Sequence, residues 1–261
     1  MKTILDRFQV DIVFHLAAQP IVPFSNTSPY ETLATNAMGT YAVLEAIRTA
    51  YQQPRLVFAS SGAYYGTTST TTPIKEEDTP LPATNIYGPS KVAGDIVVRS
   101  FAKTFGIKAA VCRFMNTYGP GDTNFSRLVP RALFNLLNNP ARPYDFGDRD
   151  DGTTKLDFLY IADMAEAYIA VAEHLDDLEA DVVNVGTGTL HSIQEIANSV
   201  SRLFDGEQRQ AIFSGEPKTT VISKCLDNTK ITQLTNWTPK TSPEDGIRQS
   251  IDWYREHWDQ L

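Results

Sequence analysis

Cysteine and histidine are scarce in this chain of 261 residues, and neither forms a recognisable ligand cluster. The two cysteines, Cys112 and Cys225, lie far apart in the sequence, which argues against a disulfide framework and favours reduced thiols. The four histidines are scattered, without the close spacing of a zinc site. We therefore expect no catalytic metal.

Long apolar runs are also missing. No stretch approaches the ~18 apolar residues that span a membrane, and the first seven residues lack the features of a secretory leader. With 42% hydrophobic residues, the chain can still bury a full core in one or two domains. We expect a soluble, cytoplasmic protein without a membrane partner.

Acidic residues outnumber basic ones: the chain has 31 Asp and Glu but only 23 Lys and Arg. Its formal net charge is −8. A surface that binds nucleic acid normally shows a basic excess, so nucleic acid is not an expected partner. A small anionic ligand stays compatible with this balance, since it needs only a few local cations.

Glycine is absent from the front of the chain, where the first one is Gly39. Dinucleotide-binding domains normally open with a strand, a glycine-rich turn and a helix, and backbone amides of that turn approach the pyrophosphate. No such turn can precede the first strand predicted here.

What the sequence does contain is an alternation of strands and helices. Short apolar runs predict strands over residues 11–18, 56–60, 108–114 and 182–186. Helices are predicted over residues 30–50, from residue 88, and from a Ser192/Glu195 capping box to residue 204. This alternation is typical of an α/β fold with a doubly wound parallel sheet.

A Tyr-x-x-x-Lys pair, Tyr87 and Lys91, lies at the start of the second predicted helix. The i, i+4 spacing places the phenol and the ammonium on one helix face. There the cation would favour the phenolate and lower the tyrosine pKa from ~10 toward the working pH. A tyrosine of that kind is a usable acid or base.

Three segments together resemble the extended short-chain dehydrogenase/reductase family, which includes the nucleotide-sugar epimerases and dehydratases. They are the strand running into Ser60-Ser61-Gly62, the Tyr87/Lys91 pair, and Arg113-Phe114-Met115-Asn116-Thr117-Tyr118-Gly119-Pro120. The resemblance implies a Rossmann-like sheet and a smaller α/β substrate domain. We expect residues 1–118 and 157–188 in the first, and residues 119–156 and 189–261 in the second.

In that family the strand predicted at residues 11–18 is the fourth of the sheet, so the chain resembles an enzyme shortened at its N-terminal end. We favour a sequence that starts inside a longer protein. The alternative is a naturally shortened form that binds cofactor weakly or not at all. In either case a strand that is normally central becomes an edge strand. Its unpaired backbone groups could then pair with a strand of another molecule.

The resemblance assigns catalysis to Ser61, Tyr87 and Lys91. Tyr87, as phenolate, would take the proton of the sugar 4-hydroxyl while hydride passes from C4 to NAD, giving a 4-keto intermediate. Ser61, rather than its neighbour Ser60, would hydrogen-bond the 4-oxygen. Lys91 would also bind the nicotinamide ribose.

The same resemblance implies a cofactor site that includes Ala17, Ala18, Asn36 and Phe114 beside the catalytic tyrosine and lysine. The small alanines would let the backbone approach the cofactor, and Asn36 would help to position Lys91. NAD is the expected cofactor, and NADP is not excluded, because the residue that reads the ribose 2′-hydroxyl belongs to the missing front.

For the substrate, the resemblance implies contacts from Asn116 and Arg127 to the diphosphate or sugar. Tyr144 and Phe146 fall in the base-binding stretch, with core packing as an equal alternative. Where the family usually has Arg-Asp-Phe, this chain has Leu156-Asp157-Phe158, so an arginine clamp is lost and Lys155 replaces it only imperfectly. Lys218 is a weaker candidate.

The reaction class depends on the two residues that follow Ser61. Family dehydratases place an acid there, whereas this chain has Gly62 and Ala63, which cannot transfer a proton. A 4-epimerase needs no such acid. Other segments, at residues 18–20, 35–40 and 121–130, look closest to CDP-glucose 4,6-dehydratases, but the site decides the chemistry.

We therefore expect an NAD-dependent nucleotide-sugar 4-epimerase. One alternative is a CDP-glucose-type 4,6-dehydratase that has moved its acid elsewhere. The other is a non-catalytic nucleotide-sugar-binding protein that lacks the cofactor loop. Family members commonly dimerise through two helices per subunit, so we expect a homodimer formed by the helix at residues 30–50 and the helix that carries Lys91.

Overall fold

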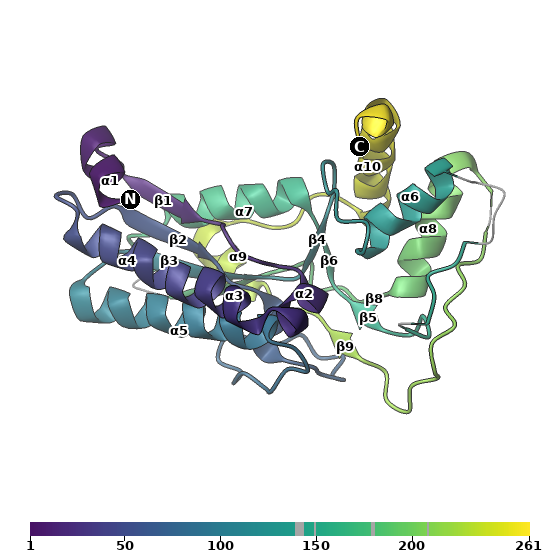
Figure 1. The fold of residues 1–261 in the computed structure, drawn as a ribbon, viewed down its shortest axis with the longest axis horizontal. Coiled ribbons are helices and arrows are strands. Elements are labelled where there is room, and N and C mark those ends of the chain that lie inside the picture. Colours follow the sequence, from purple (N-terminus) through teal and green to yellow (C-terminus); the bar gives the residue numbers. More distant parts are fainter. Residues whose placement is uncertain (139–143, 149, 179–180, 208) are drawn as a thin grey trace.

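The computed structural model describes residues 1–138, 144–148, 150–178, 181–207 and 209–261. A parallel sheet with helices on both faces forms one side of the molecule, and a group of helices and short strands forms the other (Figure 1). The prediction of an α/β fold with a doubly wound parallel sheet is confirmed.

The central sheet has the strand order β1-β2-β3-β7, with every neighbouring pair parallel. Its strands are β1 (Ile12–His15), β2 (Arg55–Ala59), β3 (Ala109–Phe114) and β7 (Val182–Val185). The sequence predicted all four. It did not predict the short strands β4 (Asn116–Tyr118), β5 (Lys155–Leu156), β6 (Phe158–Tyr160), β8 (His191–Ser192) and β9 (Ser223–Lys224).

The larger helices are α4 (Gly39–Thr49), α5 (Tyr87–Phe105), α6 (Leu128–Asn138), α7 (Ile161–Glu173), α8 (Ile193–Asp205) and α10 (Pro243–His257). The shorter ones are α1 (Lys2–Phe8), α2 (Val22–Thr27), α3 (Pro29–Leu33), α9 (Thr229–Thr235), the π-helix η1 (Ala34–Met38) and the 3₁₀ helices η2 (Gly62–Tyr65) and η3 (Trp258–Gln260). The capping box of Ser192 and Glu195 opens α8 as predicted.

The predicted helix over residues 30–50 is present as one continuous helical run of α3, η1 and α4, interrupted only by the widened π turn η1. The widened π turn contains Asn36, whose side chain is hydrogen-bonded outside the helix, to Gln19 and Ser90. Single π turns of this kind are frequent at functional sites.

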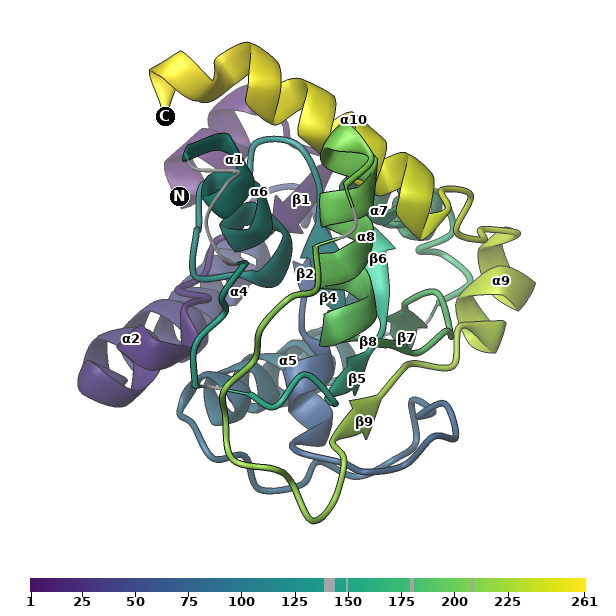
Figure 2. The same cartoon turned by 90° about the vertical axis from the view of Figure 1, so that its right-hand side faces the viewer.

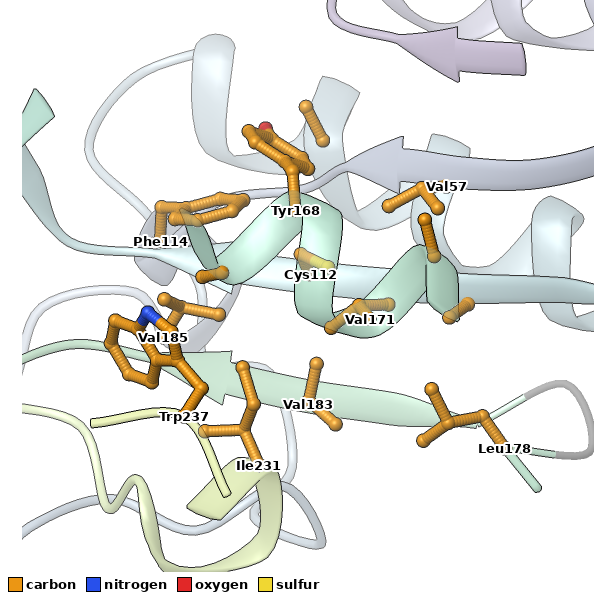
Figure 3. Packing of buried hydrophobic residues seen from close by; sticks show 14 of the residues in the cluster. Val57, Cys112, Phe114, Tyr168, Val171, Leu178, Val183, Val185, Ile231 and Trp237 are labelled. Atoms are coloured by element: carbon orange, nitrogen blue, oxygen red, sulfur yellow. The ribbon is translucent and has the colours of Figure 1, made fainter. Parts of the chain in front are cut away.

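The two faces of the sheet are buried under different helices, because side chains alternate along each strand. Leu56 and Phe58 pack in one cluster with apolar residues of α4 and α5. Val57 and Cys112 pack in another, under Tyr168 and neighbouring residues of α7 (Figure 3). Ile231 and Trp237, in and after α9, close that second cluster beside β7.

Strand β1 lies at the edge of this sheet, as expected, and pairs only with β2 among the described strands. Phe14 and Leu16, in and just after β1, are exposed. Exposed apolar side chains along a free strand edge are a site where another strand can add.

A further apolar cluster joins α6, α8 and α10 beside the ends of β4 and β6 (Figure 2). Leu133, Ile196 and Ile251 contribute one buried side chain from each of these helices. The division into two domains at the boundaries given above stays a prediction.

Among the described residues, no helix combines the length and the apolar character needed to cross a membrane. The described part of the chain also contains no group of three or more His, Cys, Asp or Glu side chains that could hold a metal ion. Cys112 and Cys225 are both buried and unbridged.

Candidate active site

The predicted catalytic residues meet at the carboxyl ends of β1, β2 and β3, where ligands bind in open parallel sheets. A cavity of about 430 Å³ lies there, lined by residues from the ends of all three strands and from the start of α5. Ser61, Tyr87 and Lys91 all line it, so the structure brings the predicted catalytic set together. We call it the Lys91 cavity.

A second cavity, of about 610 Å³, adjoins the first and shares Ser61, Tyr87 and Arg127 with it. It adds Asn116 and Lys224, and we call it the Lys224 cavity. The two cavities therefore flank the same tyrosine.

Tyr87 is positioned by the first turn of α5. Its backbone N–H donates to Ser25 Oγ at 3.1 Å, and the next N–H, of Gly88, donates to Asn85 Oδ1 at 3.0 Å. Helix starts leave such amides without intrahelical partners, so these side chains fix where α5 begins. A Cβ on Gly88 would come within 2.9 Å of Ala83 Cβ, which favours glycine beside the tyrosine.

The prediction that Lys91 lowers the pKa of Tyr87 is wrong for this structure. Burial raises the pKa of the Tyr87 phenol, while hydrogen bonding to Ser61 and the charge of Arg127 act in the opposite direction. The Lys91 ammonium instead donates to the Ala59 carbonyl at 2.8 Å. In this structure Lys91 is therefore not among the groups that lower the pKa of Tyr87.

Lys91 is a buried cation with 5% of its surface exposed. Burial lowers its pKa to about 8, and no described carboxylate lies within ion-pair distance of its ammonium. Its charge also helps burial to lower the pKa of His15, whose Nε2 lies 3.1 Å from Thr40 Oγ1. Keeping an unpaired charge here costs stability, which is common where function requires the group.

Lys91→Met is therefore expected to stabilise the fold at pH 7, by at most about 3 kcal/mol, which corresponds to several degrees in Tm. The folded-state pKa of Lys91, about 8, lies below the ordinary value of 10.5, so the unfolded chain binds this proton more tightly. The cost of the charge is complete below pH 8 and disappears as the pH approaches 10.5.

Thermal unfolding at pH 7 and pH 10, with the exposed Lys103→Met as control, measures this gain. The variant should lose most of its advantage at the higher pH, and the control should show none at either. A variant less stable than the parent at pH 7 would mean that the bond from Lys91 to Ala59 outweighs the burial of its charge.

Ser61 caps η2, since its Oγ accepts a hydrogen bond from Ala63 N at 3.1 Å. Gly62, the next residue, is packed against β3: an added Cβ would lie 2.4 Å from Met115 Sδ and 3.2 Å from the Phe114 carbonyl oxygen. An acidic side chain at position 62 would thus require Met115 to move. Packing and sequence agree that no proton-transfer group lies directly after Ser61.

Only some of the predicted cofactor residues line the Lys91 cavity. Ala18 and Phe114 line the Lys91 cavity, whereas Ala17 and Asn36 are not among its lining residues. Asn36 is buried, and it bonds the backbone of Gln19 and the hydroxyl of Ser90 rather than Lys91. It therefore ties the loop after β1, at Gln19, to α5 one residue before the lysine.

Among the predicted substrate residues, Asn116 and Arg127 line the Lys224 cavity. Asn116 Nδ2 donates to the Asp157 carbonyl at 3.3 Å, and Arg127 pairs with Asp122 at 2.8 Å. Their positions suit ligand contacts, and their roles stay predictions.

Tyr144 and Phe146 lie in the cluster of α6, α8 and α10, buried to 3% and 5% exposure. They line neither the Lys91 nor the Lys224 cavity, so the structure favours the core-packing alternative. The sequence alone could not separate base binding from core packing, because both roles require a buried aromatic ring.

Lys155 and Lys218 do not join the candidate site. Lys155 lines a separate cavity of about 640 Å³, while the next residue, Leu156, faces Asn116 and Arg127. Successive side chains of a strand point to opposite faces, so the neighbour of the missing arginine points the wrong way. Lys218 pairs with Asp150 and Asp151.

Sequence reasoning missed Lys224, which reaches the site from β9. It stands in register with Leu156 of β5, and both side chains line the Lys224 cavity. Its ammonium donates to the carbonyls of Gly62 and Gly66. No local motif marks this lysine, because only strand pairing brings it beside Leu156.

A buried ion pair beneath the site was missed as well. Arg113 donates to both carboxylate oxygens of Asp95, at 2.9 and 3.1 Å, and to the hydroxyl of Tyr65 at 2.7 Å. Ser60 Oγ donates to the same carboxylate at 2.9 Å. The network fixes the end of β2, and therefore Ser61, relative to α5.

The sequence and the structure were compared with known proteins. A family model described as "NAD dependent epimerase/dehydratase family" matches residues 1–186. A trifunctional UDP-glucose 4,6-dehydratase/UDP-4-keto-6-deoxy-D-glucose 3,5-epimerase/UDP-4-keto-L-rhamnose-reductase of Arabidopsis thaliana is 28% identical over 95% of this chain. The chain spans 37% of that relative's length.

Single-activity proteins are matched over more of their length. A UDP-glucose 4-epimerase of Halalkalibacterium halodurans is 29% identical over 98% of this chain and 80% of its own. The crystal structure of a UDP-glucuronic acid 4-epimerase from Bacillus cereus, in complex with UDP-glucuronic acid and NAD, superposes with a TM-score of 0.84. It is 25% identical, and the match covers 98% of this chain and 78% of that one.

The family model covers well over half of the chain. The protein belongs to the NAD-dependent epimerase/dehydratase family.

Proposed function

We propose that this protein is an NAD-dependent nucleotide-sugar 4-epimerase. The observation that carries the proposal is the meeting of Ser61, Tyr87 and Lys91 around one cavity, while the space after Ser61 is filled by Gly62 and Met115. A tyrosine that can exchange a proton with the 4-hydroxyl is present, and the acid needed to eliminate water is not found at the family position. Relatives that carry the name 4-epimerase support this choice.

The residues of the Lys91 cavity fit the nicotinamide end of NAD. Ala18 and Ala59 leave room at the strand ends, Phe114 and Tyr168 supply an apolar wall, and Lys91 offers a buried ammonium for ribose hydroxyls. NAD supplies the hydride acceptor and donor when it is bound. This chain's residues supply position and proton transfer.

In the proposed reaction Ser61 holds the sugar 4-oxygen beside Tyr87. The Tyr87 oxygen would take the proton of the 4-hydroxyl and later return it to the same sugar oxygen. NAD, when bound, would supply both the acceptor and the donor for the C4 hydride, so that the ring could take it back on the other face. Before it can accept this proton, the Tyr87 phenol must release its own proton to solvent, and the hydrogen bond to Ser61 and the Arg127 charge favour that release.

Titration with NADH, followed by nicotinamide fluorescence and thermal shift, tests the cofactor part of the proposal. Incubation with NAD and UDP-glucose or UDP-glucuronate, followed by product analysis, tests the reaction. Micromolar cofactor binding and a 4-epimer are expected. A 4-keto-6-deoxy product would establish a dehydratase instead, and a folded chain that binds no NADH at millimolar concentration would contradict the proposal.

We also propose a homodimer that packs α4 and α5 of one subunit against those of the other. Tyr41 of α4 and Ile96 and Phe105 of α5 are apolar and exposed, which supports a covered surface there. Light scattering should give twice the mass of the 29.0 kDa chain. A monomer at tens of micromolar would contradict this part of the proposal.

A further inference from the structure

Lys224 is the feature of the site that the proposed reaction leaves unused. It is a partly buried lysine whose side chain enters the Lys224 cavity, in which Ser61 and Tyr87 also lie. Its ammonium donates to two backbone carbonyls, those of Gly62 and Gly66. No described carboxylate lies within ion-pair distance of it, since none of the ion pairs of the structure involves Lys224.

A buried ammonium that has only carbonyl partners is a costly arrangement, because two neutral acceptors do not compensate a full charge. Burial lowers the pKa of Lys224 to about 8, so the group is still mainly charged at pH 7. Asp122 is the acidic residue among those lining this cavity, and its Oδ2 forms an ion pair with Arg127 Nη1 at 2.8 Å. An anionic group of a ligand would supply the missing partner.

The place of the ammonium indicates which part of a ligand it meets. Lys224 starts beside Leu156 in the register of β9 and β5, but its ammonium lies between the carbonyls of Gly62, the residue after Ser61, and Gly66. In the proposed reaction Ser61 holds the 4-oxygen of the sugar. On a hexose ring C1, which carries the diphosphate, lies opposite C4, while C5 and its C6 substituent lie next to C4. A cation beside Ser61 therefore meets the ring substituents near C4 rather than the diphosphate.

We propose that Lys224 binds a carboxylate on the sugar ring, so that the substrate of this site is a nucleotide-linked uronic acid, with its C6 oxidised to the acid. The inference rests on the proposed function, because it uses the sugar position that Ser61 and Tyr87 define. It makes Lys224 the residue that separates a uronic acid from the neutral hexose.

The test compares the binding of UDP-glucuronate, UDP-glucose and UDP to the parent protein, Lys224→Met and Lys224→Arg, by calorimetry with NAD present. The parent should bind UDP-glucuronate roughly tenfold more tightly than UDP-glucose, as expected for one charge-assisted hydrogen bond. Lys224→Met should lose this preference and keep its affinity for UDP, whereas Lys224→Arg should keep the preference. Lys240→Met, which removes an exposed lysine paired with Glu166, should change nothing.

Two results would overturn the inference. An equal loss of affinity for all three ligands in Lys224→Met would assign the lysine to the diphosphate. An unchanged preference would make it a structural lysine that holds Gly62 and Gly66. The proposed function is tested separately. It is contradicted if neither sugar nucleotide is epimerised, and it is supported if UDP-glucose is epimerised even when UDP-glucuronate is not preferred.

Discussion

Tyr87→Phe is expected to lower kcat for the proposed epimerisation by about 10²–10⁴-fold, the usual contribution of a positioned acid or base. The substitution removes only the phenolic oxygen that would exchange a proton with the sugar 4-hydroxyl. The ring stays in place between the Lys91 and Lys224 cavities, so KM and the affinity for NADH should change little. Steady-state kinetics and a fluorescence titration of NADH measure the two quantities.

Tyr51→Phe is the matched control, because Tyr51 is an exposed tyrosine that lines neither cavity. It should leave kcat unchanged. A Tyr87→Phe variant that keeps more than about a tenth of the parental kcat would remove this residue from the proton-transfer role. An equal drop in both variants would point to a general loss of structure.

Asp95→Asn is expected to destabilise the fold by about 3–5 kcal/mol, because it leaves the buried guanidinium of Arg113 without a counter-charge. Asp95 and Arg113 are 0% and 1% exposed, and the carboxylate also accepts hydrogen bonds from Ser60 and Arg99. A chain of this size should then lose roughly 10 °C or more in Tm. Urea unfolding at pH 7 measures the change in free energy.

An exposed pair supplies the control for this loss. Glu45 and Arg48 form a two-bond ion pair on the surface of α4, at 2.6 and 2.7 Å, and Glu45→Gln should leave the free energy of unfolding nearly unchanged because water screens this exposed pair. Replacing both buried partners, as Asp95→Leu with Arg113→Met, should cost less than the sum of the two single changes. An Asp95→Asn variant as stable as Glu45→Gln would show that the buried network contributes little to folding.

The strands of the central sheet, and the position of Tyr87 and Lys91 on one helix face, could be predicted because their signals are local. The run that forms β3 is apolar except for Arg113, and the spacing of Tyr87 and Lys91 follows from the helical repeat. The pKa of Tyr87 could not be predicted in the same way. It depends on how deeply the phenol is buried and on where the Lys91 ammonium points, and only the packed site fixes both.

The sequence by itself determined the alternating α/β order, the spacing of Tyr87 and Lys91 on one helix face, and the lack of an acid after Ser61. Tertiary structure decided that Lys155 faces away from the site and that Lys224, far along the chain, enters it. It also buried Tyr144 and Phe146 in a core and paired Arg113 with Asp95. The physical reason is the range of the interactions: helix spacing acts over a few residues, whereas strand register, burial and ion pairing join residues that only the folded chain brings together.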